Sequence, residues 1–154
     1  MKVEFVNPFI QAASDVLDSE LGGESQRGPV RLERSSVTSD EVTTLVGVTG
    51  GVTGLVMISM SQATALGLVS RILGQDCQEF DALAQSGIGE LGNVITGRAA
   101  VLLSEAGYPS NITPPALVVG KGTMITTLDL NQLICPLQTE VGPLEIQVIL
   151  KSAA

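Results

Sequence analysis

The segment FDALAQSGIGELGNVITGRAAVLLSEA, residues 80–106, is the longest regular element that the sequence predicts. Its apolar residues recur at steps of three and four, which places them together on one side of an amphipathic helix. Gly107 and Pro109 follow and would end it, so we expect a helix over residues 79–106. The apolar positions are Phe80, Leu83, Ala84, Ile88, Leu91, Ile95, Ala99, Leu102 and Ala106.

Two further helices are predicted before this segment. Residues 5–21 show the same apolar spacing, and Gly22-Gly23 marks the stop. Residues 62–73 form the other, because Ser61 is a good N-cap and Gly74 is a common residue at a helix C-terminus.

Strands account for most of the remaining chain. Runs rich in β-branched residues at 41–48 and 52–60 flank Gly50-Gly51, whose glycines suit a tight hairpin turn. Strand-like runs also occur at residues 30–36, 116–120, 128–140 and 144–151, and the last two should form another hairpin. We therefore expect an α/β (α+β) fold in which a mixed, mainly antiparallel sheet of about six strands packs against three helices.

Composition limits the possible functions. A chain of 154 residues has the length of one domain, residues 1–154, and 44% hydrophobic residues are too many for disorder. The net charge of −8 argues against nucleic-acid binding, because no cluster of Lys and Arg is present to neutralise phosphates.

Targeting and metal signals are also missing from the sequence. The first residues lack the apolar core of a signal peptide, and no apolar run reaches the ~18–20 residues that span a bilayer. We expect a cytoplasmic protein without a membrane partner. With no histidine, and with Cys77 and Cys135 outside any CxxC spacing, an ordinary transition-metal site and a histidine-based triad are excluded.

A polar pair, Glu90 and Asn93, is surrounded by three glycines in the long helical segment. Each glycine inside a helix costs roughly 1 kcal/mol relative to alanine, so keeping Gly87, Gly89 and Gly92 should provide close packing or room for a partner. Residues three apart in a helix are neighbours, so the carboxylate and the amide can touch one partner at once.

A helical wheel places this pair on the side away from the apolar residues. Ser86 and Gly97 fall on the same side, and Gly89 lies beside them. We expect Ser86, Gly89 and Gly97 to form a shallow shoulder on which a partner docks. Gly89, Gly92 and Gly97 are the glycines that we interpret as giving that partner room around Glu90 and Asn93.

Two interpretations of the pair remain open on the residues alone. In the structural one, Glu90 and Asn93 are solvated residues, and the glycines let the helix pack against the 62–73 helix or a second copy. In the functional one, the amide orients a water molecule and the carboxylate anchors a lysine of the partner.

The motif around the pair resembles a known family. DALAQSGIGELGN at residues 81–93, then Thr96-Gly97 and NITPP at 111–115, is similar to the CheC/CheX/FliY family of bacterial chemotaxis phosphatases, and to its CheX members most closely. The likeness includes VGVTGG at 46–51 and, in element order, nearly the whole chain.

This resemblance implies a phosphatase that hydrolyses the aspartyl phosphate of a CheY-like response regulator. By the likeness, Asn93 would orient the attacking water and Glu90 would anchor the active-site lysine of the regulator. The regulator would supply the phosphate and its Mg²⁺, so no cofactor or metal ligand is expected in this chain.

The number of sites bears on the oligomeric state. CheC-like members carry a second acid–amide pair on the first helix, where this chain has Asp15-Val-Leu-Asp18 and no amide. A single site resembles the CheX members, which work as dimers, so a homodimer is expected, through either the 128–150 strands or the small-residue flank of the long helix.

The alternative function is a non-catalytic module that binds a response regulator or another signalling partner.

Overall fold

The computed structural model describes residues 3–33, 37–38, 40–125 and 131–152. Within them the chain forms helices α1 (Val3–Leu21), α2 (Gln62–Leu73) and α3 (Ala82–Glu105). All three predicted helices are confirmed, and their ends differ from the predicted ones by at most three residues. None of the helices in the described residues is long and apolar enough to cross a membrane.

Most of the strands belong to one eight-stranded sheet, in which six strands follow the order β1-β9-β10-β5-β4-β6. In the same sheet, β2 also pairs with β9, and β7 also pairs with β4. Every strand pairing in the described residues is antiparallel. The expected α/β (α+β) fold, with a mainly antiparallel sheet packed against three helices, is therefore confirmed, although the large sheet has eight strands instead of about six and contains no parallel pair in the described residues. The strands of this sheet are β1 (Gln26–Arg27), β2 (Arg31–Glu33), β4 (Val42–Gly50), β5 (Val52–Met60), β6 (Ser110–Ile112), β7 (Ala116–Val119), β9 (Gln132–Thr139) and β10 (Gly142–Ser152); β3 (Val37–Thr38) and β8 (Met124–Ile125) pair separately.

The six predicted strands correspond to β2, β4, β5, β7, β9 and β10. The two additional strands of the large sheet, β1 and β6, lie outside the strand-like runs that the sequence predicted. They have two and three residues, too few to show an alternating pattern. The predicted start of the penultimate strand, at residue 128, falls outside the described residues, and the observed strand begins at Gln132.

Local chemistry explains the elements that were predicted well. The β4–β5 hairpin pairs Val46 with Val56, and its turn residue Gly50 has φ 106°, which favours glycine. At the start of α2 the Ser61 hydroxyl accepts a hydrogen bond from the Thr64 backbone N–H at 3.1 Å, and Gly74 ends the helix with φ 69°.

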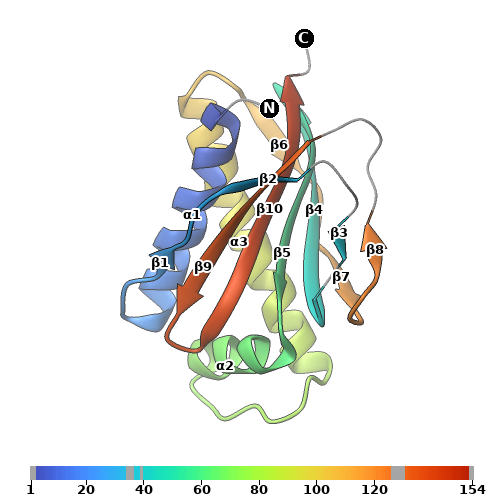
Figure 1. The fold of residues 1–154 in the computed structure, drawn as a ribbon. Coiled ribbons are helices and arrows are strands. Elements are labelled where there is room, and N and C mark those ends of the chain that lie inside the picture. Colours follow the sequence, from blue (N-terminus) through green and yellow to red (C-terminus); the bar gives the residue numbers. More distant parts are fainter. Residues whose placement is uncertain (1–2, 34–36, 39, 126–130, 153–154) are drawn as a thin grey trace.

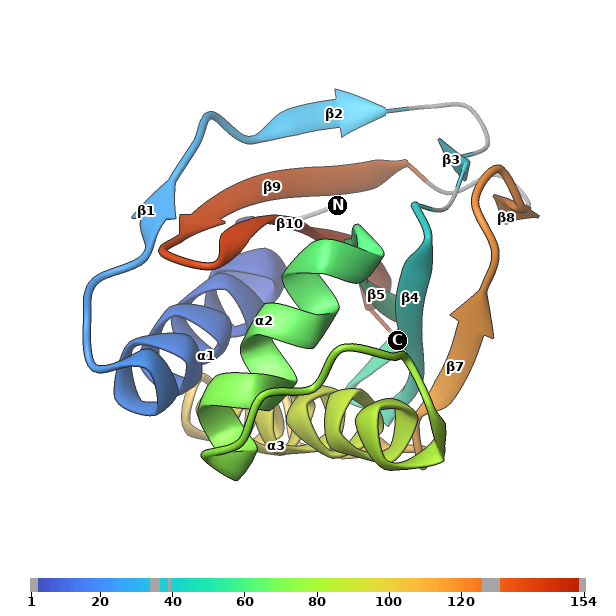
Figure 2. The same ribbon diagram turned by 90° about the horizontal axis from the view of Figure 1, so that it is seen from below.

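The helices cover one face of the sheet (Figure 1). Seen from below, α1 and α3 lie side by side under the strands, and α2 crosses at their end (Figure 2). The core lies between these layers, with side chains such as Phe9, Val56, Ile88 and Ile146 almost completely buried. This arrangement leaves one long side of α3 facing outward.

An ion pair ties α1 to α3 near the surface. Arg98 of α3 donates from Nη2 to Oδ2 of Asp15 on α1 at 2.9 Å, and its Nε donates to the same oxygen at 3.2 Å. The hydrogen bond from Arg98 lowers the pKa of the Asp15 carboxyl, with a smaller lowering effect from Gln11, while burial acts in the opposite direction.

Replacing Asp15 with Asn should lower the free energy of unfolding at pH 7 by no more than about 1 kcal/mol, because the pair is partly exposed and screened. A carboxyl with a lowered folded-state pKa stabilises above its unfolded pKa, and that contribution is lost as pH falls through the folded value. Urea unfolding of Asp15→Asn and wild type should therefore give different free energies at pH 7, and the difference should shrink progressively as pH falls below about 4. A difference that stays constant to pH 2.5 would contradict this assignment.

Candidate functional site

Helix α3 begins at its N-cap Asp81, whose carboxylate accepts a hydrogen bond from the Ala84 backbone N–H at 3.0 Å. The predicted start at residue 79 was therefore three residues early. From this cap the helix packs against α1, α2 and the sheet, with Ile88, Ile95 and Leu103 directed into the core. The rotation of α3 that buries these residues places Glu90 on the exposed side.

Gly92 lies against the sheet. It is buried, and a Cβ at this position would overlap the side-chain methyl group of Thr44 on β4. The interpretation that Gly92 gives a partner room was wrong, because this glycine faces the core and permits close approach of α3 to β4. Gly87 also faces inward, where an added Cβ would lie 3.3 Å from the Val69 side chain of α2, as the structural interpretation expected.

Gly89 and Gly97 differ from these two. A Cβ added at either position would meet no other group within 4 Å. Both glycines border open space on the side of α3 that carries Glu90, and the Ser86 side chain is exposed there as well. The structure therefore places Ser86, Gly89 and Gly97 on one accessible surface, while their use by a partner stays a prediction.

The two candidate catalytic residues occupy the middle of α3, one turn apart. Glu90 is exposed and Asn93 is partly buried. In the part of the chain that the structure describes, neither side chain makes a hydrogen bond or an ion pair. A carboxylate and an amide without internal partners are available to bind groups of another molecule.

A buried threonine lies one turn beyond Asn93. The Thr96 hydroxyl donates to the Gly92 carbonyl at 2.8 Å and approaches the Asn93 carbonyl at 3.3 Å. Thr96 is fully buried, so this hydroxyl is satisfied within the helix itself. Together with the contact between Gly92 and Thr44, it fixes the turn of α3 that carries Asn93.

Glu90 borders a hollow of about 410 Å³ where α1, α2 and α3 meet. Its walls are mainly apolar, and they include Leu73, Leu83 and Val94, which are 40%, 51% and 45% exposed. Leu83 was predicted to face the core, and this was wrong, because it lies at the open end of α3 on the outer side. Ser86 also lines the hollow.

Sequence reasoning missed this hollow and the contribution of Val16, Glu20 and Val94 to it. A signal existed for Val94, which a helical wheel places about 40° from Glu90 on the outer side of the helix. No comparable signal marks Val16 and Glu20, because their proximity depends on how α1 packs beside α3. Asn93 lies about 60° from Glu90 in the other direction and does not line the hollow.

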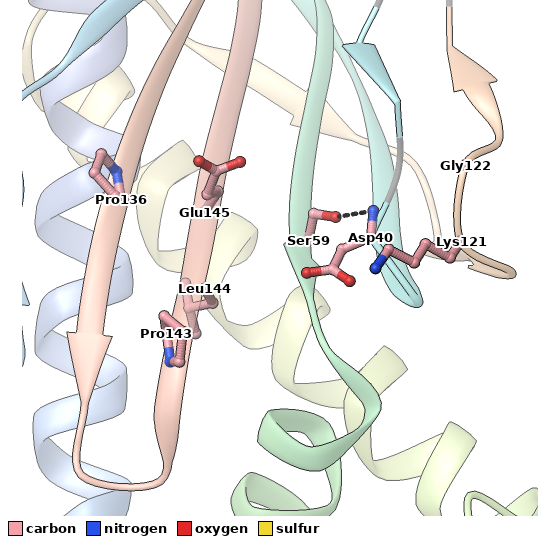
Figure 3. A pocket seen from close by; sticks show the side chains of 8 residues that line it. All are labelled: Asp40, Ser59, Lys121, Gly122, Pro136, Pro143, Leu144 and Glu145. Carbon is pink, nitrogen blue, oxygen red and sulfur yellow. Dashed lines mark hydrogen bonds between the residues drawn. The ribbon is translucent and has the colours of Figure 1, made fainter.

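A larger hollow, about 540 Å³, lies on the opposite face of the sheet. Figure 3 shows it between β9 and β10 on one side and Asp40 and Lys121 on the other. The Ser59 hydroxyl accepts from the Asp40 backbone N–H at 3.1 Å, and Glu145 accepts from Arg31 at 2.9 Å. These groups are engaged within the fold, and the predicted site residues lie elsewhere.

Within the described residues, no three Cys, Asp or Glu side chains lie together so that they could hold a metal ion. The Glu90 carboxylate can accept hydrogen bonds and pair with a cation, and the Asn93 amide can both donate and accept hydrogen bonds.

Comparisons with known proteins identify the family of the chain. Residues 42–138 match the family model described as chemotaxis phosphatase CheX. A CheY-P phosphatase CheX of Thermotoga maritima is 34% identical over 126 residues, which are 81% of each chain. The chain belongs to the CheX family of chemotaxis phosphatases.

Solved structures of this family share the fold. A CheC-like superfamily protein from Shewanella sp. PV-4 superposes with a TM-score of 0.89 at 28% identity, covering 99% of this chain and all of the other. The CheX chain from a CheX-CheY-BeF₃-Mg²⁺ complex of Borrelia burgdorferi gives 0.83 at 27% identity, covering 98% of this chain and all of that one. The resemblance of the chain to this family is thereby confirmed, whereas the roles of Glu90 and Asn93 stay predictions.

The glycines of α3 provide a direct test of this packing. Gly89→Ala and Gly97→Ala should each raise the free energy of unfolding by up to about 1 kcal/mol, because alanine favours the helix and has free space. Gly92→Ala should lower it by about 1–3 kcal/mol, because its Cβ overlaps Thr44.

Urea unfolding of the three single variants measures these differences. The double variant Gly92→Ala with Thr44→Ser removes the overlapping methyl group and should recover part of the loss. Equal changes in the free energy of unfolding for alanine at positions 89, 92 and 97 would contradict the close contact of Gly92 on α3 with Thr44 on β4.

Proposed function

We propose that the chain is a protein phosphatase that hydrolyses the aspartyl phosphate of a CheY-like response regulator. The observation that carries the proposal is the pair on α3, an exposed Glu90 and a partly buried Asn93, whose side chains have no internal partners in the described residues. Membership of the CheX family, with a CheY-P phosphatase among the relatives, supports the same reaction.

Asn93 is the residue that we assign to the water. Its amide donates and accepts hydrogen bonds, so it can hold a water molecule in line with the phosphorus of the regulator's aspartyl phosphate. Attack by that water breaks the acyl phosphate bond and releases inorganic phosphate and a free aspartate. Gly92 and Thr96 hold the turn that carries Asn93, which favours a fixed position of the amide.

Glu90 is assigned to docking. Its carboxylate is exposed one turn before Asn93 and is suited to bind a lysine in the regulator's active site. We further propose that the regulator brings the Mg²⁺ that neutralises its phosphate, and that this chain adds none. An enzyme that only positions water and contacts the partner requires no metal ligands of its own.

Two substitutions separate the assigned roles. Asn93→Ala should reduce kcat for phosphate release from the phosphorylated regulator about 100-fold with little change in KM, because only the water loses its orientation. Glu90→Ala should raise KM about tenfold, because docking loses a charged contact. Phosphate release, followed with each candidate regulator of the organism, measures both.

Ser104→Ala is a suitable control, because Ser104 is exposed on the same side of α3 near its C-terminal end. It should behave like wild type. If wild type leaves the decay of every phosphorylated regulator unchanged, the chain is a binding module and the enzymatic proposal fails.

We also propose a homodimer that works in the cytoplasm together with its regulator. Support comes from strand β7, which in the described residues pairs only with β4 and leaves its other edge available, with Val119 exposed. Sedimentation at micromolar concentration should give about twice the chain mass of 15.9 kDa. A species of 15.9 kDa alone would refute the dimer.

A further inference from the structure

The hollow beside Glu90 continues into a second one of about 360 Å³ along α1 and α3. Both hollows are lined by Val16, Glu20 and Val94, so they form one groove, which we call the α1–α3 groove. Leu73 and Leu83 lie at one end, and the ion pair of Asp15 with Arg98 closes the other. The combined space is large enough for one or two side chains of another protein.

Apolar side chains around the groove are unusually accessible. Leu83 and Val94 are each about half exposed although they border a concave surface, where burial would be favourable. An exposed apolar cluster in a depression with a polar rim is typical of a protein interaction site.

The charges around the groove favour an occupant with cationic side chains. Glu20 and Glu90 stand on its rim, and in the described residues neither carboxylate is paired with a base. Asp15 differs, because Arg98 neutralises it. Two unpaired carboxylates beside apolar walls complement a surface that presents an apolar side chain next to cationic ones.

We propose that the α1–α3 groove seats an apolar side chain of the phosphorylated regulator, and that Glu20 binds a second cationic side chain of that regulator beside it. This proposal rests on the proposed function. Glu20 then acts as a docking residue on α1, and Val94 and Leu83 form the apolar wall that determines which regulator fits.

The regulator is favoured over a second copy of this chain for two reasons. Glu90 is itself part of the groove rim, so any other occupant would cover the residue assigned to the regulator. The chain has 16 acidic and 8 basic residues, so a second copy would on average bring repulsive charge to the two carboxylates.

The apolar wall is tested by Val94→Ser and Leu83→Ser, with Val101→Ser as the matched control. Val101 is 58% exposed on the same helix and lies outside both hollows. Each groove variant should raise KM for the phosphorylated regulator about tenfold with kcat unchanged, because burial of the partner's side chain is lost in both ground and transition states. Val101→Ser should match wild type.

The acidic rim is tested by Glu20→Gln, with Glu105→Gln as a control because Glu105 is exposed beyond the groove. Glu20→Gln should weaken binding of the BeF₃-treated regulator about two- to fivefold at low salt, as expected for an exposed ion pair. The difference should shrink at 0.5 M salt, where exposed charges are screened. Glu105→Gln should bind like wild type at both salt concentrations.

The two proposals fail differently in these experiments. Suppose that wild type releases phosphate, but the KM values of Val94→Ser and Leu83→Ser equal that of Val101→Ser. The groove proposal is then overturned, and the proposed phosphatase function is retained. If Val94→Ser changes the oligomeric mass measured by sedimentation but not KM, a second copy of the chain occupies the groove. That result would also overturn the groove proposal. If wild type releases no phosphate from any regulator, the proposed function itself fails.

Discussion

The close approach of α3 to β4 at Gly92 is the contact on which the candidate site depends. A helix that carries a side chain at this position would be displaced from Thr44 and would move or rotate relative to the sheet. Glu90 and Asn93 lie within two residues of this contact, so their position follows it closely. The site is therefore fixed by packing on its hidden side, although its chemistry faces outward.

The glycines of α3 have different physical roles, and composition alone could not distinguish them. Gly87 and Gly92 allow neighbouring elements to approach, and the gain in packing offsets their low helix propensity. Gly89 and Gly97 have no such neighbour in the fold, so their cost of roughly 1 kcal/mol each has no structural compensation there. This difference favours a partner as the reason for Gly89 and Gly97.

Sequence was sufficient where the signal was local. Ser61 marks the start of α2 and Gly74 marks its end, because helix capping depends only on neighbouring backbone groups. Gly50 marks the β4–β5 hairpin because a tight turn likewise depends on the backbone angles of its own residues. The outward side of α3 was also predictable, because a helix of this length determines its own periodicity. The family motif at residues 81–93 added the link to chemotaxis phosphatases.

Features that depend on distant segments could not be predicted in this way. Strands β1 and β6 exist because longer strands offer them an edge, and their few residues carry no pattern of their own. Leu83 follows the apolar spacing of α3, yet it is exposed because the helices beside it leave a hollow at that end. The sequence identified the residues of the pair, whereas only the packing of α1 against α3 showed that Glu90 borders a groove with Glu20. A docking surface is thus a property of neighbouring helices, and a motif on one of them describes only part of it.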